Sequence, residues 1–262
     1  MDLSFLIDML TPVANVILLS IARPYGFTMT FIVFAWFRAD TGMVRMGVAI
    51  ALGVPIFAYA GPQEYELINS SEIPVLILLL KEILIGAIMG WLVSFPLLIA
   101  SGAGGIIDTY SGGSQGTTDP TGGQVTPVAH LFMITTLGLF ATVGGFWIVT
   151  DLLYESYATW PIYTALPDIT AGIDIIFSMI TSLVAAAFIL AAPILAVMFF
   201  SDIIFLIAAK LGKKINVTFL AFTVKSTIVI LLLPVFTYIL VQADKKNFEQ
   251  FSQVSVFFRS LL

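Results

Sequence analysis

The sequence contains no cysteine and a single histidine, His130. Without cysteine, the chain has no disulfide, no thiolate metal ligand and no cysteine nucleophile. One histidine leaves few metal or acid–base sites, and neither H-E-x-x-H nor G-x-S-x-G occurs. We therefore expect no enzyme activity, no catalytic residue, no metal and no cofactor. His130 is interpreted as a residue at a helix start or in a packed core.

Charge is also scarce, since charged residues make up only 10% of the 262 residues while 59% are hydrophobic. Soluble domains carry about 25% charged residues. So few charges cannot cover the surface of a soluble 28.4 kDa protein with a mean hydropathy of +1.05, so its surroundings must be membrane lipid or other protein. The 11 Lys and Arg are outnumbered by 16 Asp and Glu, and no basic stretch could follow a phosphate backbone, which excludes a nucleic-acid binder. No basic region precedes the first apolar run, so we expect a retained membrane segment and not a cleaved signal peptide.

Long uncharged runs predict an all-α fold, that is, a polytopic hydrophobic helical membrane protein with about six segments arranged as kinked hairpins. About 20 apolar residues span the core of a bilayer. Proline predicts a helix end or kink at Arg23-Pro24, and further kinks at Pro55, Pro96, Pro193 and Pro234. The six runs are Met9–Phe37, Met46–Gln63, Ile73–Ile107, Leu131–Thr150, Ile175–Ala209 (interrupted by Asp202) and Ser226–Ala243.

The placement of Lys and Arg predicts the orientation, because basic loops stay in the cytoplasm. Arg38–Arg45 and Lys210–Lys214 are basic and should be cytoplasmic. Gly61–Glu72 and Asp151–Asp174 carry acids and no base, so we expect both to be loops outside the membrane.

The stretch Ser101–Thr126 holds eight of the chain's 20 glycines and lies between two strongly apolar segments. Glycine is conformationally free, so we expect an irregular, mobile loop. A surface linker is one interpretation. The other is a polar, non-helical segment at membrane depth, which is tolerated only inside protein or along a water-filled path. The stretch lacks lysine, which excludes a phosphate-binding P-loop.

Ionisable residues inside membrane segments are costly and usually paired. Lys81 and Glu82 are adjacent and project about 100° apart on a helix, so we expect each to pair elsewhere and not with the other. Asp202 and Lys225 flank Lys210–Lys214 at similar distances, which predicts an ion pair across a hairpin. The alternative is that these charges mark helix ends near the headgroups. The five candidate intramembrane charges are Arg23, Lys81, Glu82, Asp202 and Lys225.

Several short motifs occur in an order and spacing typical of one family. They are Arg23-Pro24, Arg45-Met46-Gly47, Lys81–Trp91 (KEILIGAIMGW), Ile107-Asp108, Gly112, Asp119-Pro120, Leu152–Tyr157 followed by Trp160-Pro161, Asn216-Val217 and Lys225-Ser226. In these motifs the chain resembles the SctT family of type III secretion export-apparatus proteins (YscT, SpaR, EscT), which is homologous to flagellar FliR.

The resemblance implies a non-enzymatic pore subunit of the type III secretion export gate, multi-pass in the bacterial inner membrane and belonging to the basal body. Such a subunit helps to form and close the channel for unfolded secreted proteins. Implied partners are SctR-like and SctS-like export-gate subunits, an SctU-like switch protein, translocating unfolded polypeptides and membrane lipid. A single domain over residues 1–262 is implied, in which an SctR-like region covers residues 1–174, an SctS-like helical hairpin covers residues 175–243 and a tail covers residues 244–262.

The family's plug loop maps onto Gly104–Thr126, where small side chains suit a segment that fills a pore and moves aside. Ile106, Ile107 and Tyr110 are expected to anchor its start, and Asp108 and Asp119-Pro120 to fix its turns. The expected gate residues are Gly104, Gly105, Ile106, Ile107, Asp108, Tyr110, Gly112, Gly113, Gly116, Asp119, Pro120, Gly122 and Gly123.

An alternative function remains open, namely a free-standing secondary transporter. Its glycine-rich break would bind an ion or solute through Asp108 or Asp119. The inverted repeat that such transporters often carry is not visible in the sequence.

Overall fold

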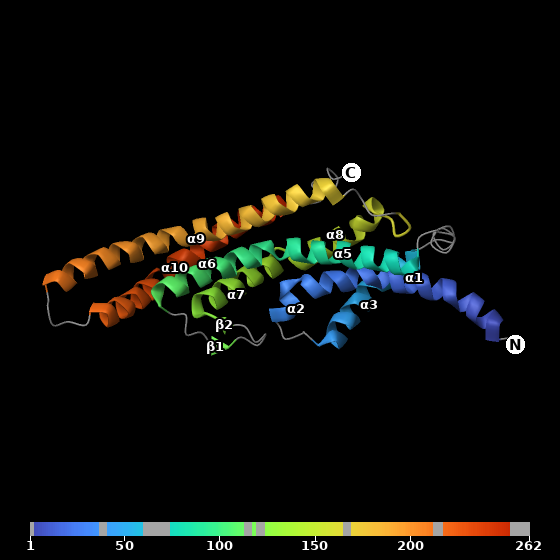
Figure 1. Ribbon diagram of the computed structural model, residues 1–262, viewed down its shortest axis with the longest axis horizontal. Helices are drawn as coiled ribbons and strands as arrows, with labels where there is room; N and C mark the ends of the chain where they lie inside the picture. The colour runs from blue at the N-terminus through green and yellow to red at the C-terminus, as the bar shows by residue number, and fades with distance from the viewer. Residues whose placement is uncertain are drawn as a thin grey trace. The chain divides into compact units, whose positions relative to one another are not determined.

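A computed structural model of the chain describes residues 3–36, 41–59, 74–112, 117–118, 124–164, 169–211 and 217–251. Helices dominate these ranges (Figure 1). They are α1 (Leu3–Thr30), α2 (Ile32–Trp36), α3 (Gly42–Tyr59), α5 (Val75–Val93), α6 (Phe95–Ser111), α7 (Pro127–Thr142), α8 (Gly145–Thr159), α9 (Ile169–Leu211) and α10 (Val217–Phe251). The short strands β1 (Thr117–Thr118) and β2 (Gln124–Val125) pair antiparallel.

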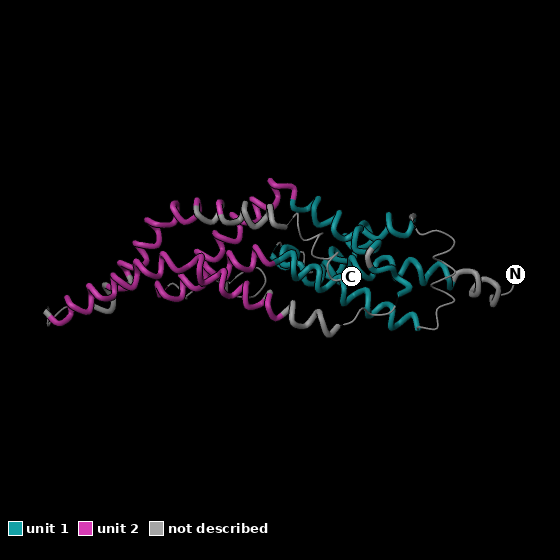
Figure 2. Tube along the Cα trace, turned by 90° about the horizontal axis from the view of Figure 1, so that it is seen from above, with its two compact units in different colours: residues 1–94, 145–173, 252–262 teal, residues 95–144, 174–251 magenta. Residues whose placement is uncertain are grey.

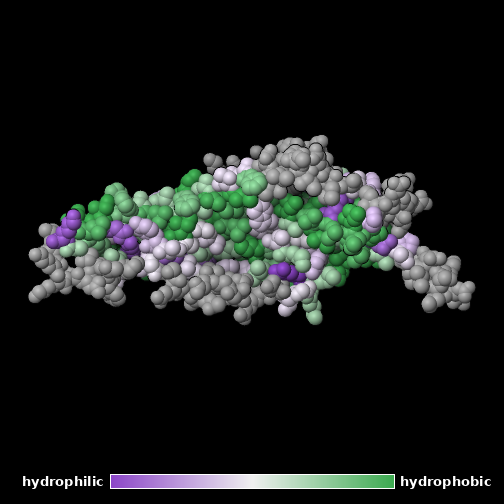
Figure 3. Space-filling view, in the orientation of Figure 1, coloured by the Kyte–Doolittle hydropathy of each residue, from purple (hydrophilic) through white to green (hydrophobic). Residues whose placement is uncertain are grey.

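The predicted all-α membrane fold is confirmed. Within the described ranges, α5 over Val75–Val93 and α9 over Ile180–Lys210 are long and apolar enough to cross a membrane. A third candidate arises if α7 and α8 form one broken span. Figure 3 shows hydrophobic side chains over much of the described surface on one face. Large exposed apolar residues such as Leu76, Phe188 and Ile204 fit surroundings of lipid or protein.

The chain divides into two compact units, coloured separately in Figure 2. Unit 1 comprises residues 1–94, 145–173 and 252–262, and unit 2 comprises residues 95–144 and 174–251. Each unit therefore combines segments that are distant in the sequence. The predicted division at residues 174 and 243, into an SctR-like region, a hairpin and a tail, stays a prediction.

In unit 1, α1 packs against α5 and α3. Glycines make the contact with α5 close, because a Cβ at Gly86 would overlap the carbonyl oxygen of Arg23. A Cβ at Gly90, one turn further, would overlap the carbonyl oxygen of Phe27. Small residues four apart let two helix backbones approach in this way. The interface brings Glu82, which precedes Gly86 by one turn, onto the face that meets α1.

In unit 2, α6 packs against α7, and α10 contacts both. The core that they share with α9 is apolar and tightly enclosed. Its buried residues are Ala100, Ala103, Ile107, Val128, Phe132, Ala191, Ile194, Met198, Val229 and Phe236.

Helix ends differ from the predicted ones at several places. The first helix does not end at Arg23-Pro24, since α1 runs through Pro24 to Thr30. Proline frees the carbonyl one turn earlier, that of Ser20, and the hydroxyl of Tyr157 donates to this oxygen at 3.1 Å. A side chain from another helix thus satisfies the backbone group that proline leaves open.

Three of the six predicted runs are each broken into two helices. The run 73–107 breaks at Ser94, so Pro96 is the second residue of α6, where its missing N–H is not needed. Gly144, at φ 78°, lies between α7 and α8. Asp151–Asp174 is not one continuous loop, because α8 extends to Thr159 and α9 begins at Ile169. Its place outside the membrane stays a prediction.

Candidate functional site

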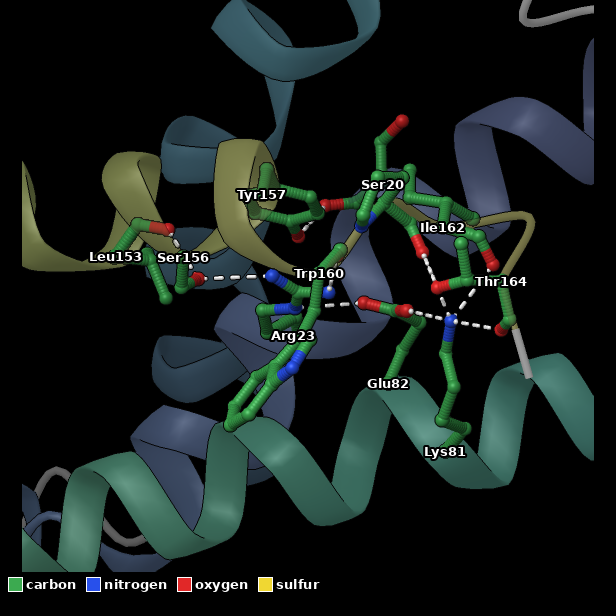
Figure 4. Close-up of polar contacts among 11 residues, drawn as sticks. Ser20, Arg23, Lys81, Glu82, Leu153, Ser156, Tyr157, Trp160, Ile162 and Thr164 are labelled. Carbon is green, nitrogen blue, oxygen red and sulfur yellow. Dashed lines mark hydrogen bonds and ion pairs between the residues drawn. The ribbon is translucent and has the colours of Figure 1, made fainter. Parts of the chain in front are cut away.

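A fully buried arginine organises the first polar site, which lies in unit 1 (Figure 4). Arg23 is 0% exposed and donates through Nε to Glu82 Oε2 at 2.7 Å. Its Nη1 donates to Ser156 Oγ at 2.8 Å, and its Nη2 donates to the carbonyl oxygen of Trp160 at 2.7 Å. The guanidinium also lies over the Tyr157 ring, 3.9 Å from its centroid. One side chain of α1 thereby binds α5, α8 and the turn that follows α8.

Lys81 completes this site from the other side of Glu82 (Figure 4). Its Nζ donates to the carbonyl oxygens of Pro161, Ile162 and Thr164 at 2.8–3.1 Å. These bonds use all three hydrogens of an ammonium group. Lys81 Nζ also lies 2.9 Å from Glu82 Oε1, so the prediction that these neighbours do not pair was wrong. The long lysine side chain bends back far enough to overcome the angle between adjacent helical positions.

Asp108 organises the second site, in unit 2, at the base of the glycine-rich segment. Its Oδ2 accepts hydrogen bonds from the backbone N–H groups of Val128 at 2.9 Å and Ala129 at 3.1 Å. These are free N–H groups in the first turn of α7, where a negative charge is favourable. Burial raises the pKa of the Asp108 carboxyl above its ordinary value, and the hydrogen bonds that it accepts near the start of α7 oppose this shift only in part. The carboxylate therefore joins the two ends of the segment.

The glycine-rich stretch is not an irregular loop from Ser101 onward, as predicted, because α6 remains helical to Ser111. Close packing on α7 explains this difference. A Cβ at Gly104 would overlap the Cα and backbone nitrogen of Ala129, so only glycine permits this approach. The chain leaves the helix at Gly112, whose φ of 80° favours glycine.

The predicted gate residues fall into two groups. Those in α6 are Gly104, Gly105, Ile106, Ile107, Asp108 and Tyr110, with Gly112 directly after the helix. The others, Gly113, Gly116, Asp119, Pro120, Gly122 and Gly123, lie outside the described residues. Ile107 is fully buried in the unit 2 core, and the expected role of Ile106, Ile107 and Tyr110 as anchors stays a prediction.

The predicted ion pair between Asp202 and Lys225 is present. Lys225 Nζ lies 2.6 Å from Asp202 Oδ1. Tyr110 adds a contact that was not predicted, because its hydroxyl donates to Asp202 Oδ2 at 2.9 Å. Partial burial, followed by the hydrogen bond to Asp202 and the charge of that carboxylate, raises the pKa of Tyr110 above its ordinary value.

An open cavity of about 730 Å³ lies beside α6 in unit 2. Its lining includes Ser101, Gly105 and Tyr110 of α6 and Phe188 and Leu195 of α9. Asp108, which a transporter would use to bind an ion or solute, is not among the lining residues and is only 3% exposed. Across the ranges that the structure describes, no group of three His, Cys, Asp or Glu residues could hold a metal ion.

Residues 14–251 match the family described as bacterial export proteins, family 1. The chain belongs to this family. It is 26% identical over 197 residues to the "Yop proteins translocation protein T" of Yersinia pestis, covering 74% of this chain and 75% of that protein. It is 26% identical to the "Surface presentation of antigens protein SpaR" of Shigella flexneri over 60% of each chain. The "Secretion system apparatus protein SsaT" of Salmonella typhimurium is 25% identical over 78% of this chain and 81% of its own length.

The resemblance to the export-apparatus proteins of type III secretion is thereby confirmed at the level of the family. The polar sites of this export protein lie within the matched residues. All five predicted intramembrane charges are among them, and each has a charged partner. His130 lies in the first turn of α7.

Sequence reasoning missed the residues of α8 and the following turn that surround Arg23. Ser156, Tyr157 and Trp160 all contact its guanidinium. They belong to the motifs Leu152–Tyr157 and Trp160-Pro161, which carried the family resemblance without an assigned role. A fully buried arginine needs several acceptors, so the polar and aromatic residues of these two motifs were the available signal in the sequence.

Proposed function

We propose that this chain is a non-enzymatic pore subunit of the type III secretion export gate. In this proposal it is a multi-pass protein of the bacterial inner membrane within the basal body, and it helps to form and close the channel for unfolded polypeptides. Family membership and the apolar helices support this function. The relatives named as translocation and secretion-apparatus proteins support it further.

We further propose that the segment 104–126 closes the channel at rest. The observation that carries this proposal is the fixed base of the segment, where Asp108 binds the N–H groups of Val128 and Ala129. A pore wide enough for an unfolded chain would leak ions unless something filled it. The helical residues up to Ser111 form the fixed base. Residues 112–126 are rich in Gly, Ser and Thr, so they would fill space without large side chains and open at low free-energy cost.

Partners follow from the same assignment. We propose that α9 and α10 form an SctS-like hairpin that assembles with SctR-like and SctS-like subunits beside an SctU-like switch protein. A pull-down in mild detergent tests this assembly, because a pore subunit retains two other small hydrophobic proteins. A transporter would run alone or with copies of itself, and that result would contradict the proposal.

Shortening the segment between Gly112 and Gly123 tests the gate. We expect the complex to assemble, while leakage of small dyes or ions rises and secretion begins prematurely. A deletion of equal length within Gly61–Glu72 is the matched control and should leave leakage unchanged. If the shortened protein assembles, secretes normally and stays tight, the segment is a linker and the gate lies in another subunit.

A further inference from the structure

Three helices of unit 2 meet in a closed polar network at the end of α6. Asp202 of α9 uses both carboxylate oxygens, Oδ2 for the Tyr110 hydroxyl and Oδ1 for the Lys225 ammonium. Lys225 of α10 also lies over the Tyr110 ring, with Nζ 4.7 Å from its centroid. Each of the three residues therefore contacts the other two, so a displacement of one helix strains the contacts of both others.

Because Tyr110 lies at the end of α6, the network also holds the point from which the rest of the glycine-rich segment begins. Tyr110 precedes the last residue of α6 by one position, and the chain leaves the helix at Gly112. Asp108 and Tyr110 are two residues apart and project about 200° apart on a helix. Accordingly, Asp108 binds the start of α7, while Tyr110 binds α9 and α10 through the network. The last turn of α6 is thus held from two opposite sides.

We propose that Tyr110 is a positioning residue that ties the start of the glycine-rich segment to α9 and α10, so that a displacement of these helices moves the segment. This inference rests on the proposed gate function and assigns the contact through which the gate is set. Asp202 and Lys225 complete the tie, and their side chains are 27% and 11% exposed. Asp108, which forms the other attachment, is only 3% exposed. Partly exposed charge contacts break and re-form more easily than buried ones. Of the two attachments, the network is therefore the one suited to release.

Distance measurement between two spin labels tests the tie directly. Labels at Thr109 of α6 and Leu206 of α9 occupy exposed positions, and the absence of native cysteine makes their attachment specific. The full-length chain would be studied in its membrane complex. Tyr110→Phe keeps the ring over Lys225 and removes only the hydroxyl. Two populations are expected in the distance distribution, one with the tie formed and one with it released. Because Tyr110→Phe removes a hydrogen bond to a charged group, we expect the ratio of the tied to the released population to fall about tenfold.

Two further variants make the measurement specific. Tyr238→Phe removes from α10 a hydroxyl that accepts a hydrogen bond from Gln242, outside the network, and should leave the distances unchanged. Asp202→Asn should release the end of α6 as Tyr110→Phe does, and the double variant should add little to either single change. Unchanged distances in Tyr110→Phe, or additive effects in the double variant, would overturn the inference.

Dye leakage separates this inference from the gate itself. Raised leakage in Tyr110→Phe together with released distances supports the coupling. Released distances with normal leakage, in a complex that leaks when the segment is shortened, overturn the coupling and leave the gate standing. If the shortened segment does not leak, the gate proposal fails, and the distances still decide whether Tyr110 positions the end of α6.

Discussion

The carboxylate oxygen Oδ2 of Asp108 lies 2.9 Å from the backbone nitrogen of Val128, twenty residues further along the chain. These two residues enclose residues 109–127, which hold five of the eight glycines of the glycine-rich stretch. The next backbone N–H, that of Ala129, donates to the same oxygen. A carboxylate from one helix therefore serves as the N-terminal cap of another, and this contact fixes the span that the intervening residues must bridge.

Replacing Asp108 with alanine should loosen the start of α7. The substitution leaves two buried N–H groups without their acceptor, which costs about 1–3 kcal/mol. Hydrogen exchange in the full-length protein should show faster exchange at Val128 and Ala129. Asp151→Ala, which removes an exposed carboxylate from α8, is the control. Unchanged protection at both amides in Asp108→Ala would show that the carboxylate does not hold the helix.

Two adjacent glycines of α6 offer a matched pair of substitutions. Gly104→Ala should destabilise the protein, because its Cβ would overlap the backbone of Ala129 and force α6 and α7 apart. Gly105→Ala meets no atom within 4 Å and should stabilise α6 by up to about 1 kcal/mol, since alanine favours helix. Thermal unfolding of the purified variants measures both effects. Equal effects would contradict the helix contact.

Composition alone misplaced the start of the glycine-rich loop, for a physical reason. Gly102, Gly104 and Gly105 lower the helix propensity of the stretch, but the contact of α6 with α7 requires a small residue at Gly104 and outweighs the propensity. A helical spacing was nevertheless present. The buried residues of α6 recur three or four apart, at Ala100, Ala103, Gly104, Ile107, Asp108 and Ser111.

Charge pairs differ in how far the sequence predicts them. Asp202 and Lys225 lie at similar distances on either side of Lys210–Lys214, so the rise of a helix suffices to place them side by side. Arg23 and Glu82 are 59 residues apart, and their pairing depends on the packing of α1 on α5. The sequence indicated that each buried charge needs a partner, whereas the identity of a distant partner follows only from tertiary structure.

Removing Arg23 should be among the most damaging single changes in unit 1. Arg23→Met leaves Glu82 buried beside Lys81 alone, and breaking a buried pair costs about 3–5 kcal/mol. Arg23→Lys keeps the charge but cannot reproduce the planar guanidinium that reaches Glu82, Ser156 and Trp160 together. The amount of assembled complex in membranes measures the loss.

Two variants control this prediction. Arg45→Lys changes an arginine outside the cluster and should leave assembly intact. The double variant Arg23→Met with Glu82→Met removes both charges and should recover some of the loss, because no buried carboxylate then lacks its guanidinium. A double variant as damaged as the sum of the single ones would argue against direct coupling.

Single introduced cysteines should report the orientation of the chain, since the native sequence has none. We expect a cysteine at Lys213 to react only from the cytoplasm, because Lys210–Lys214 is basic, and a cysteine at Ser70 in the acidic stretch Gly61–Glu72 to react from outside. Both positions lie outside the described residues. The charge rule acts during insertion, so the unassembled subunit is the decisive sample and the assembled complex serves as comparison. Labelling of Lys213→Cys from outside in intact cells would overturn the orientation, and the assignment of Asp151–Asp174 to the outside would fall with it.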